Sequence, residues 1–249
     1  MQMTFEDAVV HIRKKPSHCV PDGYSMISIT NAHHTILTLL QIALIPSCLL
    51  QRTLVYCDRS VLHNVSFSKN CYWSTATFRP SDFPSNDYQE ITWLKWDLLV
   101  QATRSGPTLF VDADVLILRN PFDALPRSGR DMYYQRELYD SDRMNNGVLW
   151  VRNNSVAKRI LDAKPQDLTH APLEQDIVYK VTTMEERKPL PHDFVGHCWA
   201  KDKRDIMRII VTYHAHCART FPKKLDIMTR ILKEFFACNT VEMLNCSKV

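Results

Sequence analysis

A short apolar stretch that ends in two aspartates constrains the fold of this chain more than any other feature. Residues 108–111 favour a buried strand, and Asp112 and Asp114 follow it two residues apart. In an open α/β sheet, ligands bind outside the carboxyl ends of the strands. Two neighbouring carboxylates repel each other and are costly to bury, whereas a divalent cation stabilises both. The pattern therefore predicts a metal site at the edge of a sheet, with a pair of solvated loop aspartates as the alternative.

The segments before the aspartates follow the order of a nucleotide-binding α/β half. Apolar and alternating runs predict strands at residues 24–30, 52–58 and 108–111, and helices at residues 5–14, 35–44 and 91–103. A strand, a helix and a strand of these lengths predict a right-handed, parallel βαβ unit. Residues 59–90 are polar and show little periodicity, so we expect a long connection near the site.

The second half of the chain has a more mixed pattern. It predicts strands at residues 132–134, 148–151, 190–195 and 209–213, and helices at residues 155–163, 172–179 and 223–237. Ser155 is the expected N-cap of the first of these helices. Because no internal repeat or linker interrupts the 249 residues, we expect one α/β domain. Its predicted core is a Rossmann-like, mostly parallel sheet flanked by helices, with a smaller mixed region beside it.

Composition excludes several classes of site and partner. The chain has only 5 glycines and contains neither glycine-rich phosphate-binding motif, so a metal and side chains would have to bind any phosphate. The formal net charge is only +4, and Lys and Arg are scattered, which argues against nucleic-acid binding. The longest apolar candidate, residues 36–50, is interrupted by Gln41 and Pro46, so we expect no membrane segment in this chain.

Cysteines and glycosylation sequons leave the compartment open. The 8 cysteines are compatible with disulfides, but their spacing gives no pairing. Sequons occur at Asn64, Asn153 and Asn245, a number that arises easily by chance. The first residues lack the apolar core of a secretory signal. A Golgi or other secretory lumen is expected if an anchor precedes this sequence, and the cytoplasm otherwise.

Several motifs together resemble those of GT-A glycosyltransferases, and most closely the nucleotide-diphospho-sugar transferase family. The resemblance covers roughly residues 24–220 and rests on FVDADV at 110–115 with RNP at 119–121, WLKW at 93–96, NNGVLWVRN at 145–153 and EQD at 174–176. It implies a GT-A fold with a nucleotide-binding half (24–122), a donor-sugar and acceptor half (123–222), and a C-terminal helix and tail (223–249).

The resemblance also implies a metal site. Asp114 would bind Mn²⁺ or Mg²⁺, and the cation would bridge the diphosphate of the donor. Asp112 would contact the ribose and the same cation, and His214, which follows a late strand, would complete the ligand set. Such a cation would stabilise the charge of the departing diphosphate as a Lewis acid.

Further positions are implied to contact the substrates. The expected donor is a nucleotide-diphosphate sugar, a UDP-sugar above all, and the expected acceptor is a hydroxyl of a glycan or glycoprotein. Thr30 and Asn31 would lie near the base, and Lys95 near the phosphates. Asn145, Asn146 and Gln175 would face the donor sugar. The sequence departs from the family pattern at Asn146, where Ser is usual, and at Glu174, where Asp is usual.

An acidic side chain could deprotonate the acceptor hydroxyl, and Asp176 and Glu174 are the candidates. If the anomeric configuration is inverted, one of them should be the base. If it is retained, the leaving phosphate could take the proton. The sequence determines neither the stereochemistry nor the sugar transferred.

Three alternatives use the same residues differently. A phosphatase of the haloacid-dehalogenase type also carries Asp-x-Asp after an apolar strand, with Asp112 as nucleophile and Asp114 as acid or base. A nucleotide-sugar-binding domain without catalysis would keep both aspartates. His214, His216 and Cys217, with His192, His197 and Cys198, could instead form a zinc cluster, although their spacing is irregular.

Overall fold

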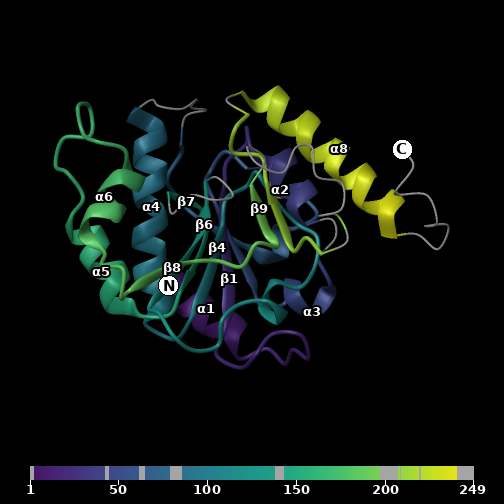
Figure 1. Cartoon of the computed structure of the whole chain (residues 1–249), viewed down its shortest axis with the longest axis horizontal. Coiled ribbons are helices and arrows are strands. Elements are labelled where there is room, and N and C mark those ends of the chain that lie inside the picture. The colour runs from purple at the N-terminus through teal and green to yellow at the C-terminus, as the bar shows by residue number, and fades with distance from the viewer. Residues whose placement is uncertain are drawn as a thin grey trace.

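A seven-stranded sheet runs through the middle of the molecule (Figure 1). The computed structural model describes residues 3–42, 45–61, 65–78, 86–137, 143–196, 207, 209–218 and 220–239. The strands of this sheet, in spatial order, are β3 (Cys71–Trp73), β2 (Thr53–Cys57), β1 (Ser25–Thr30), β4 (Thr108–Val111), β7 (Met144–Val151), β6 (Met132–Arg136) and β8 (Arg187–Pro189). Every residue of β1, β4 and β7 is buried, as expected of central strands covered on both faces.

The sheet is parallel in its first half and mixed in its second. β1 pairs in parallel with β2 and with β4, which confirms that the predicted βαβ unit is parallel. The helices α2 (Thr35–Ile42) and α3 (Ser47–Leu50) connect β1 to β2. β7 is antiparallel to both β4 and β6. The change in strand direction therefore falls beside β4, the strand that ends at the two aspartates.

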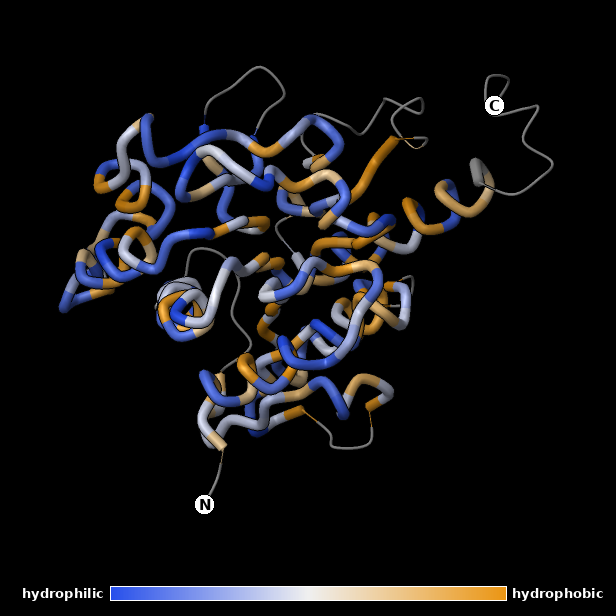
Figure 2. Tube along the Cα trace, turned by 90° about the horizontal axis from the view of Figure 1, so that it is seen from below, coloured by the Kyte–Doolittle hydropathy of each residue, from blue (hydrophilic) through white to orange (hydrophobic). Residues whose placement is uncertain are grey.

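Helices and a second sheet cover the two faces (Figure 1). One core cluster joins the large sheet to the helices α1 (Phe5–Arg13), α4 (Asn86–Thr103), α5 (Asn154–Asp162) and α6 (Glu174–Val181). Trp93 and Trp96 of α4 are buried there. The opposite face carries α2, α3 and the small sheet, and α8 (Phe221–Asn239) packs outside them. Along α8, which leads toward the C-terminus in Figure 2, hydrophobic and hydrophilic residues are interspersed.

The small sheet brings three distant segments together. Its strands are β5 (Val115–Ile117), β10 (Thr212–His214) and β9 (Phe194–Gly196), in that order. β10 is antiparallel to β5, and His214 pairs with Val115. This register places the last residue of β10 beside the residue that follows Asp114.

Several local predictions were wrong. Residues 59–90 contain the short helix η1 (Ser68–Asn70) and the edge strand β3, and α4 begins at Asn86 rather than at residue 91. A strand of three residues is too short to produce a detectable alternation. The N-cap of α5 is Asn153 rather than Ser155, because the Asn153 side chain accepts hydrogen bonds from Ser155. Residues 62–64 and 79–85 of the stretch 59–90 lie outside the described residues.

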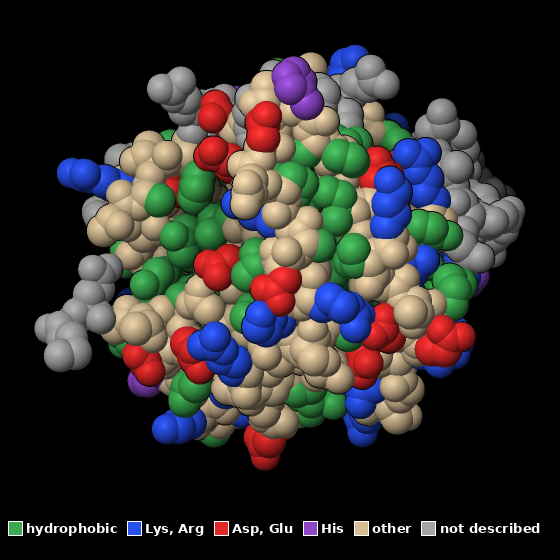
Figure 3. All heavy atoms as spheres, turned by 90° about the vertical axis from the view of Figure 1, so that its left-hand side faces the viewer, with side chains coloured by type: hydrophobic (Ala, Val, Ile, Leu, Met, Phe, Trp, Pro, Cys, Tyr) green, Lys and Arg blue, Asp and Glu red, His purple; other side chains and the backbone are tan. Residues whose placement is uncertain are grey.

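The surface mixes charges and apolar groups. Figure 3, which views the left-hand side of Figure 1, shows acidic and basic side chains interspersed around hydrophobic ones. Ion pairs such as Lys158 with Asp162 and Arg159 with Glu186 match this distribution. Among the helices that the structure describes, we find none with the length and hydrophobicity needed to cross a membrane.

Candidate functional site

A cleft of about 440 Å³ opens at the carboxyl ends of β1 and β4. Its walls come from the ends of these strands, from α4, β7 and α6, and from β10 with the start of α8. Nearly all of the predicted site residues line it: Thr30, Asn31, Lys95, Asp112, Asp114, Asn145, Asn146, Glu174, Gln175 and His214. Segments spread over most of the chain therefore converge on one cavity.

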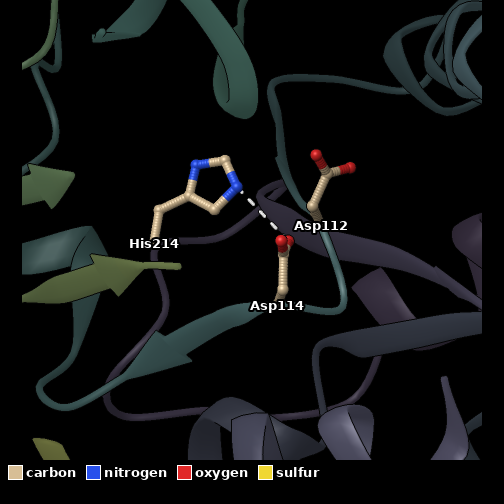
Figure 4. A group of neighbouring side chains, drawn as sticks. All are labelled: Asp112, Asp114 and His214. Atoms are coloured by element: carbon tan, nitrogen blue, oxygen red, sulfur yellow. Dashed lines mark ion pairs between the residues drawn. The ribbon is translucent and has the colours of Figure 1, made fainter. Parts of the chain in front are cut away.

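The predicted metal ligands lie close together (Figure 4). One candidate ligand atom from each of Asp112, Asp114 and His214 lies within 4.8 Å of the others. Nε2 of His214 is 3.2 Å from Oδ1 of Asp114. The turn between β4 and β5 supplies both carboxylates, and β10 supplies the imidazole. Two carboxylates with one imidazole form a donor set that suits Mn²⁺ among other divalent cations.

Burial and neighbouring charges act differently on the two aspartates. Burial, followed by the charge of Asp114, raises the pKa of Asp112, although Lys95 opposes the shift. Burial also opposes the ionisation of Asp114, but Lys224 and His214 outweigh it through charge and hydrogen bonds. They hold the pKa of Asp114 well below its usual value. The site therefore favours the ionised form of Asp114 and disfavours that of Asp112, which an added positive charge would stabilise.

Lys224 belongs to this site, although the sequence analysis missed it. Its Nζ is 2.6 Å from Oδ2 of Asp114, and its side chain remains 25% exposed. Lys224 lies in the first turns of α8 and also lines the cleft. In the sequence it is one of two adjacent lysines on an amphipathic helix, a pattern typical of a solvated face. Only the packing of α8 over the small sheet brings it to the aspartates.

Lys95, Asn146 and Glu174 form a buried cluster in the cleft wall. Nζ of Lys95 lies 3.7 Å from Oε2 of Glu174 and donates to the carbonyl oxygen of Asn146 at 3.2 Å. Asn146 Nδ2 donates to Glu174 Oε1 at 2.9 Å, and Trp96 Nε1 donates to the same oxygen. The two positions at which the sequence departs from the family pattern are therefore in direct contact. Glu174 is the first residue of α6 and lies on the buried face of this helix, so its carboxylate can accept these bonds.

The two predicted catalytic carboxylates do not share the cleft. Asp176 is exposed and lines a separate depression of about 290 Å³, together with Gln175 and Tyr179. Residues two apart on a helix point about 200° away from each other, so Glu174 and Asp176 cannot face the same way.

The polar residues after β1 and in β7 organise the backbone of the cleft. Asn31 is buried, and its Oδ1 accepts a hydrogen bond from the backbone N–H of His34 at 2.9 Å. Thr30 Oγ1 accepts from the hydroxyl of Thr38 at 2.8 Å. Oδ1 of Asn145 accepts from the backbone N–H of Gly147 at 2.9 Å. These contacts fix the edges of the cleft and leave Gln175 as a half-buried wall residue.

The described part of the chain offers no support for the zinc alternative. Cys217 is disulfide-bonded, and the ring of His192 lies against Arg136. Burial and His214 lower the pKa of His216 to about 4. His197 and Cys198 lie outside the described residues. Within the described residues, Asp112, Asp114 and His214 are the group with metal-ligand spacing.

Comparison with known proteins identifies one matching family. A sequence model described as nucleotide-diphospho-sugar transferase matches residues 52–228, which is more than half of the chain. An uncharacterised protein of Arabidopsis thaliana is 25% identical over 166 residues, or 61% of this chain. The aligned part is 49% of that protein, so the chain spans about half the length of this curated relative.

Two solved glycosyltransferases have a similar fold. An enzyme involved in glycosylation of the major capsid of PBCV-1 is 13% identical with a TM-score of 0.56, over 83% of this chain and 98% of that one. Galactosyltransferase LgtC, solved with donor and acceptor sugar analogues, is 10% identical with a TM-score of 0.54, over 87% and 97%. At these identities the likeness establishes the GT-A fold, as predicted.

Proposed function

The chain belongs to the nucleotide-diphospho-sugar transferase family, a family of glycosyltransferases, and we propose that it transfers a sugar from a nucleotide-diphosphate donor to a hydroxyl acceptor with the help of a divalent cation. The observation that carries the proposal is the convergence of Asp112, Asp114 and His214 at the rim of the sheet. A UDP-sugar is the proposed donor, and a glycan or glycoprotein is the proposed acceptor. The family match also favours transfer over the phosphatase alternative.

The residues present fit a divalent cation. The three side chains offer two carboxylates and an imidazole, and His214 turns Nε2 rather than Nδ1 toward Asp114. When bound, the cation would supply Lewis-acid stabilisation of the departing diphosphate. Mn²⁺ is our first choice and Mg²⁺ the second, because imidazole suits Mn²⁺ better than Mg²⁺.

The surrounding residues would bind and orient the donor. Lys224 brings a second positive charge to the same end of the cleft, where the phosphates would lie. Asp112 would face the ribose, and Thr30 and Asn31 the base. Asn145, Asn146 and Gln175 would line the sugar subsite, with Lys95 held at its base by Glu174.

We assign Glu174 to organising the cleft wall rather than to proton transfer. Its carboxylate already accepts from Trp96 and Asn146 and faces the ammonium of Lys95. Asp176 lies outside the cleft. We further propose that the whole chain acts as one catalytic domain, with the boundaries at residues 122 and 222 marking the change from nucleotide to sugar contacts.

Thermal unfolding with nucleotides and Mn²⁺ tests the function. A ligand at 100 times its Kd stabilises the folded state by about 2.7 kcal/mol, which corresponds to a Tm increase of roughly 5–10 °C for a chain of this size. We expect this increase with UDP plus Mn²⁺ and its loss with EDTA. Asp114→Asn should also abolish it, because the variant lacks one anionic ligand.

Asp162→Asn is the matched control, because Asp162 is an exposed aspartate on α5 paired with Lys158. It should keep the full increase in Tm. Turnover of a UDP-sugar with an acceptor then separates an enzyme from a binding domain. If no nucleoside diphosphate gives a Mn²⁺-dependent increase in the unaltered protein, the proposed function is wrong.

A further inference from the structure

The side chain of Gln135 lies between the large sheet and the small one. Gln135 is on β6 and is fully buried. Its Nε2 donates to the carbonyl oxygens of Val195 at 2.8 Å and Phe194 at 3.3 Å, both on β9. Carbonyl oxygens only accept hydrogen bonds, so the amide nitrogen must face β9. The amide oxygen of Gln135 must therefore face the opposite way.

The amide oxygen of Gln135 meets the imidazole of His214. Oε1 lies 2.7 Å from Nδ1 of His214. Because an amide oxygen cannot donate, Nδ1 must carry a proton in this contact. The other ring nitrogen, Nε2, is turned toward Asp114 and the candidate metal site. Nε2 donates to ionised Asp114 in this arrangement, and with Nδ1 held protonated it is the nitrogen whose proton a cation would displace and whose lone pair would bind that cation.

An irregularity in strand pairing makes room for this contact. Tyr134 of β6 pairs with Leu149 of β7, but the next residue, Gln135, pairs with Asn145. The residues of β7 between these partners include Gly147. A Cβ atom at Gly147 would lie 2.0 Å from Cε1 of His214, so the ring rests directly on the glycine backbone. The imidazole is thus confined by Gly147 on one side and oriented by Gln135 at Nδ1.

We propose that Gln135 is the positioning residue of the metal site: it holds the proton of His214 on Nδ1 and aims Nε2 at the cation. The inference rests on the proposed metal site and extends it by one residue that no pattern in the sequence indicated. Hydrogen-bond partners of metal-binding histidines fix the tautomer, and their loss typically lowers metal affinity by about 10–100-fold.

Gln135→Met tests the inference, because Met has a similar length and shape but its thioether sulfur is only a weak acceptor for Nδ1–H. With ¹⁵N-labelled histidine, the unaltered metal-free protein should show a protected Nδ1–H signal that His214→Gln removes. The same signal should be lost in Gln135→Met. This measurement requires no metal and therefore does not depend on the proposed function.

Titration calorimetry with Mn²⁺ gives the second readout. Gln135→Met should bind Mn²⁺ about 10–100-fold more weakly than the unaltered protein. Tyr133→Phe is the control, because it removes a buried hydroxyl on the same strand that donates to Ser128 at 2.9 Å, away from His214. It should lose stability but keep its Mn²⁺ affinity within about twofold.

The outcomes separate the two proposals. A Nδ1–H signal that persists in Gln135→Met, or an unchanged Mn²⁺ affinity in that variant, would overturn the role of Gln135. Failure of the unaltered protein to bind Mn²⁺ would instead overturn the metal site, while the Nδ1–H signal would still report on the Gln135 contact.

Discussion

At the scale of single residues, two aspartates two positions apart have pKa values shifted in opposite directions. Asp114 is paired with Lys224 and His214, whereas Asp112 is disfavoured as an anion by burial and by the charge of Asp114. A site that must attract a cation gains from an anion that lacks a full set of partners. The same feature makes the metal-free protein less stable than it could be.

Asp112→Asn should therefore separate stability from metal binding. A carboxyl whose pKa is raised on folding contributes stability that is complete below the unfolded pKa and is lost as the pH rises through the folded pKa. At a pH above the folded pKa, the isosteric amide avoids the cost of burying the ionised carboxylate. The metal-free variant should therefore have a Tm at pH 7 equal to or above that of the unaltered protein. Its increase in Tm with UDP and Mn²⁺ should disappear.

Thermal melts in EDTA between pH 4 and pH 8 measure this effect, with Asp162→Asn as the reference. The difference in Tm between Asp112→Asn and the unaltered protein should grow as the pH rises. A metal-free Asp112→Asn variant that melts well below the unaltered protein at pH 7 would contradict the raised pKa.

At the scale of elements, one arginine connects α1 to the start of the sheet. Arg13 is the last residue of α1, is buried, and donates its hydrogen bonds to hydroxyl and carbonyl oxygens. Its guanidinium donates to the carbonyl oxygens of Ala102, Gly106 and Pro107 at 2.9, 2.7 and 3.0 Å. Burial, followed by Arg52, lowers the pKa of Arg13 to about 10, so it stays protonated at neutral pH. These bonds hold the turn between α4 and β4, which precedes the aspartates.

Arg13→Met should destabilise the fold by roughly 3 kcal/mol, because it leaves several buried carbonyl groups without a donor. Urea denaturation measures the change. The control is Arg104→Gln, which breaks an exposed ion pair, 2.7 Å long, between Glu6 of α1 and the residue that follows α4. Exposed pairs contribute at most about 1 kcal/mol. Equal losses in the two variants would refute the role given to Arg13.

At the scale of the whole molecule, disulfides cross-link the segments at one edge of the nucleotide-binding half. Cys19–Cys48 joins the segment before β1 to α3, and Cys57–Cys71 joins β2 to β3. Cys217 is also disulfide-bonded. Disulfides persist in oxidising compartments, so we propose that the protein works in a secretory lumen rather than in the cytoplasm.

Reduction should lower the stability of the protein without metal or nucleotide. The two bonds close loops with sequence separations of 29 and 14, for which chain entropy predicts about 3–4 kcal/mol each. Urea denaturation of a Cys57→Ala/Cys71→Ala variant, with and without dithiothreitol, separates the contribution of Cys57–Cys71 from that of the remaining disulfides. A midpoint that is unchanged by reductant in the unaltered protein would argue against these bonds and against the secretory compartment.

The sequence by itself determined the elements whose signals are local. A buried strand before Asp112 and amphipathic helices of ten or more residues follow from the periodicity of burial, which neighbouring residues set. The order of strands and helices then predicted a parallel βαβ unit, because few connections join such elements. The motifs at Asp112, Asp114 and Asn145–Asn146 were visible because they follow or occupy buried strands.

Only the tertiary structure decided which side chains meet. Gln135 and His214 are 79 residues apart, and Lys95 and Asn146 are 51 apart, so no local pattern connects them. Strand pairing and helix packing bring such residues together, and these depend on the burial of whole surfaces rather than on sequence spacing. For the same reason Lys224 lies in the site and Asp176 does not, because the position of each depends on which face of its helix packs against the core.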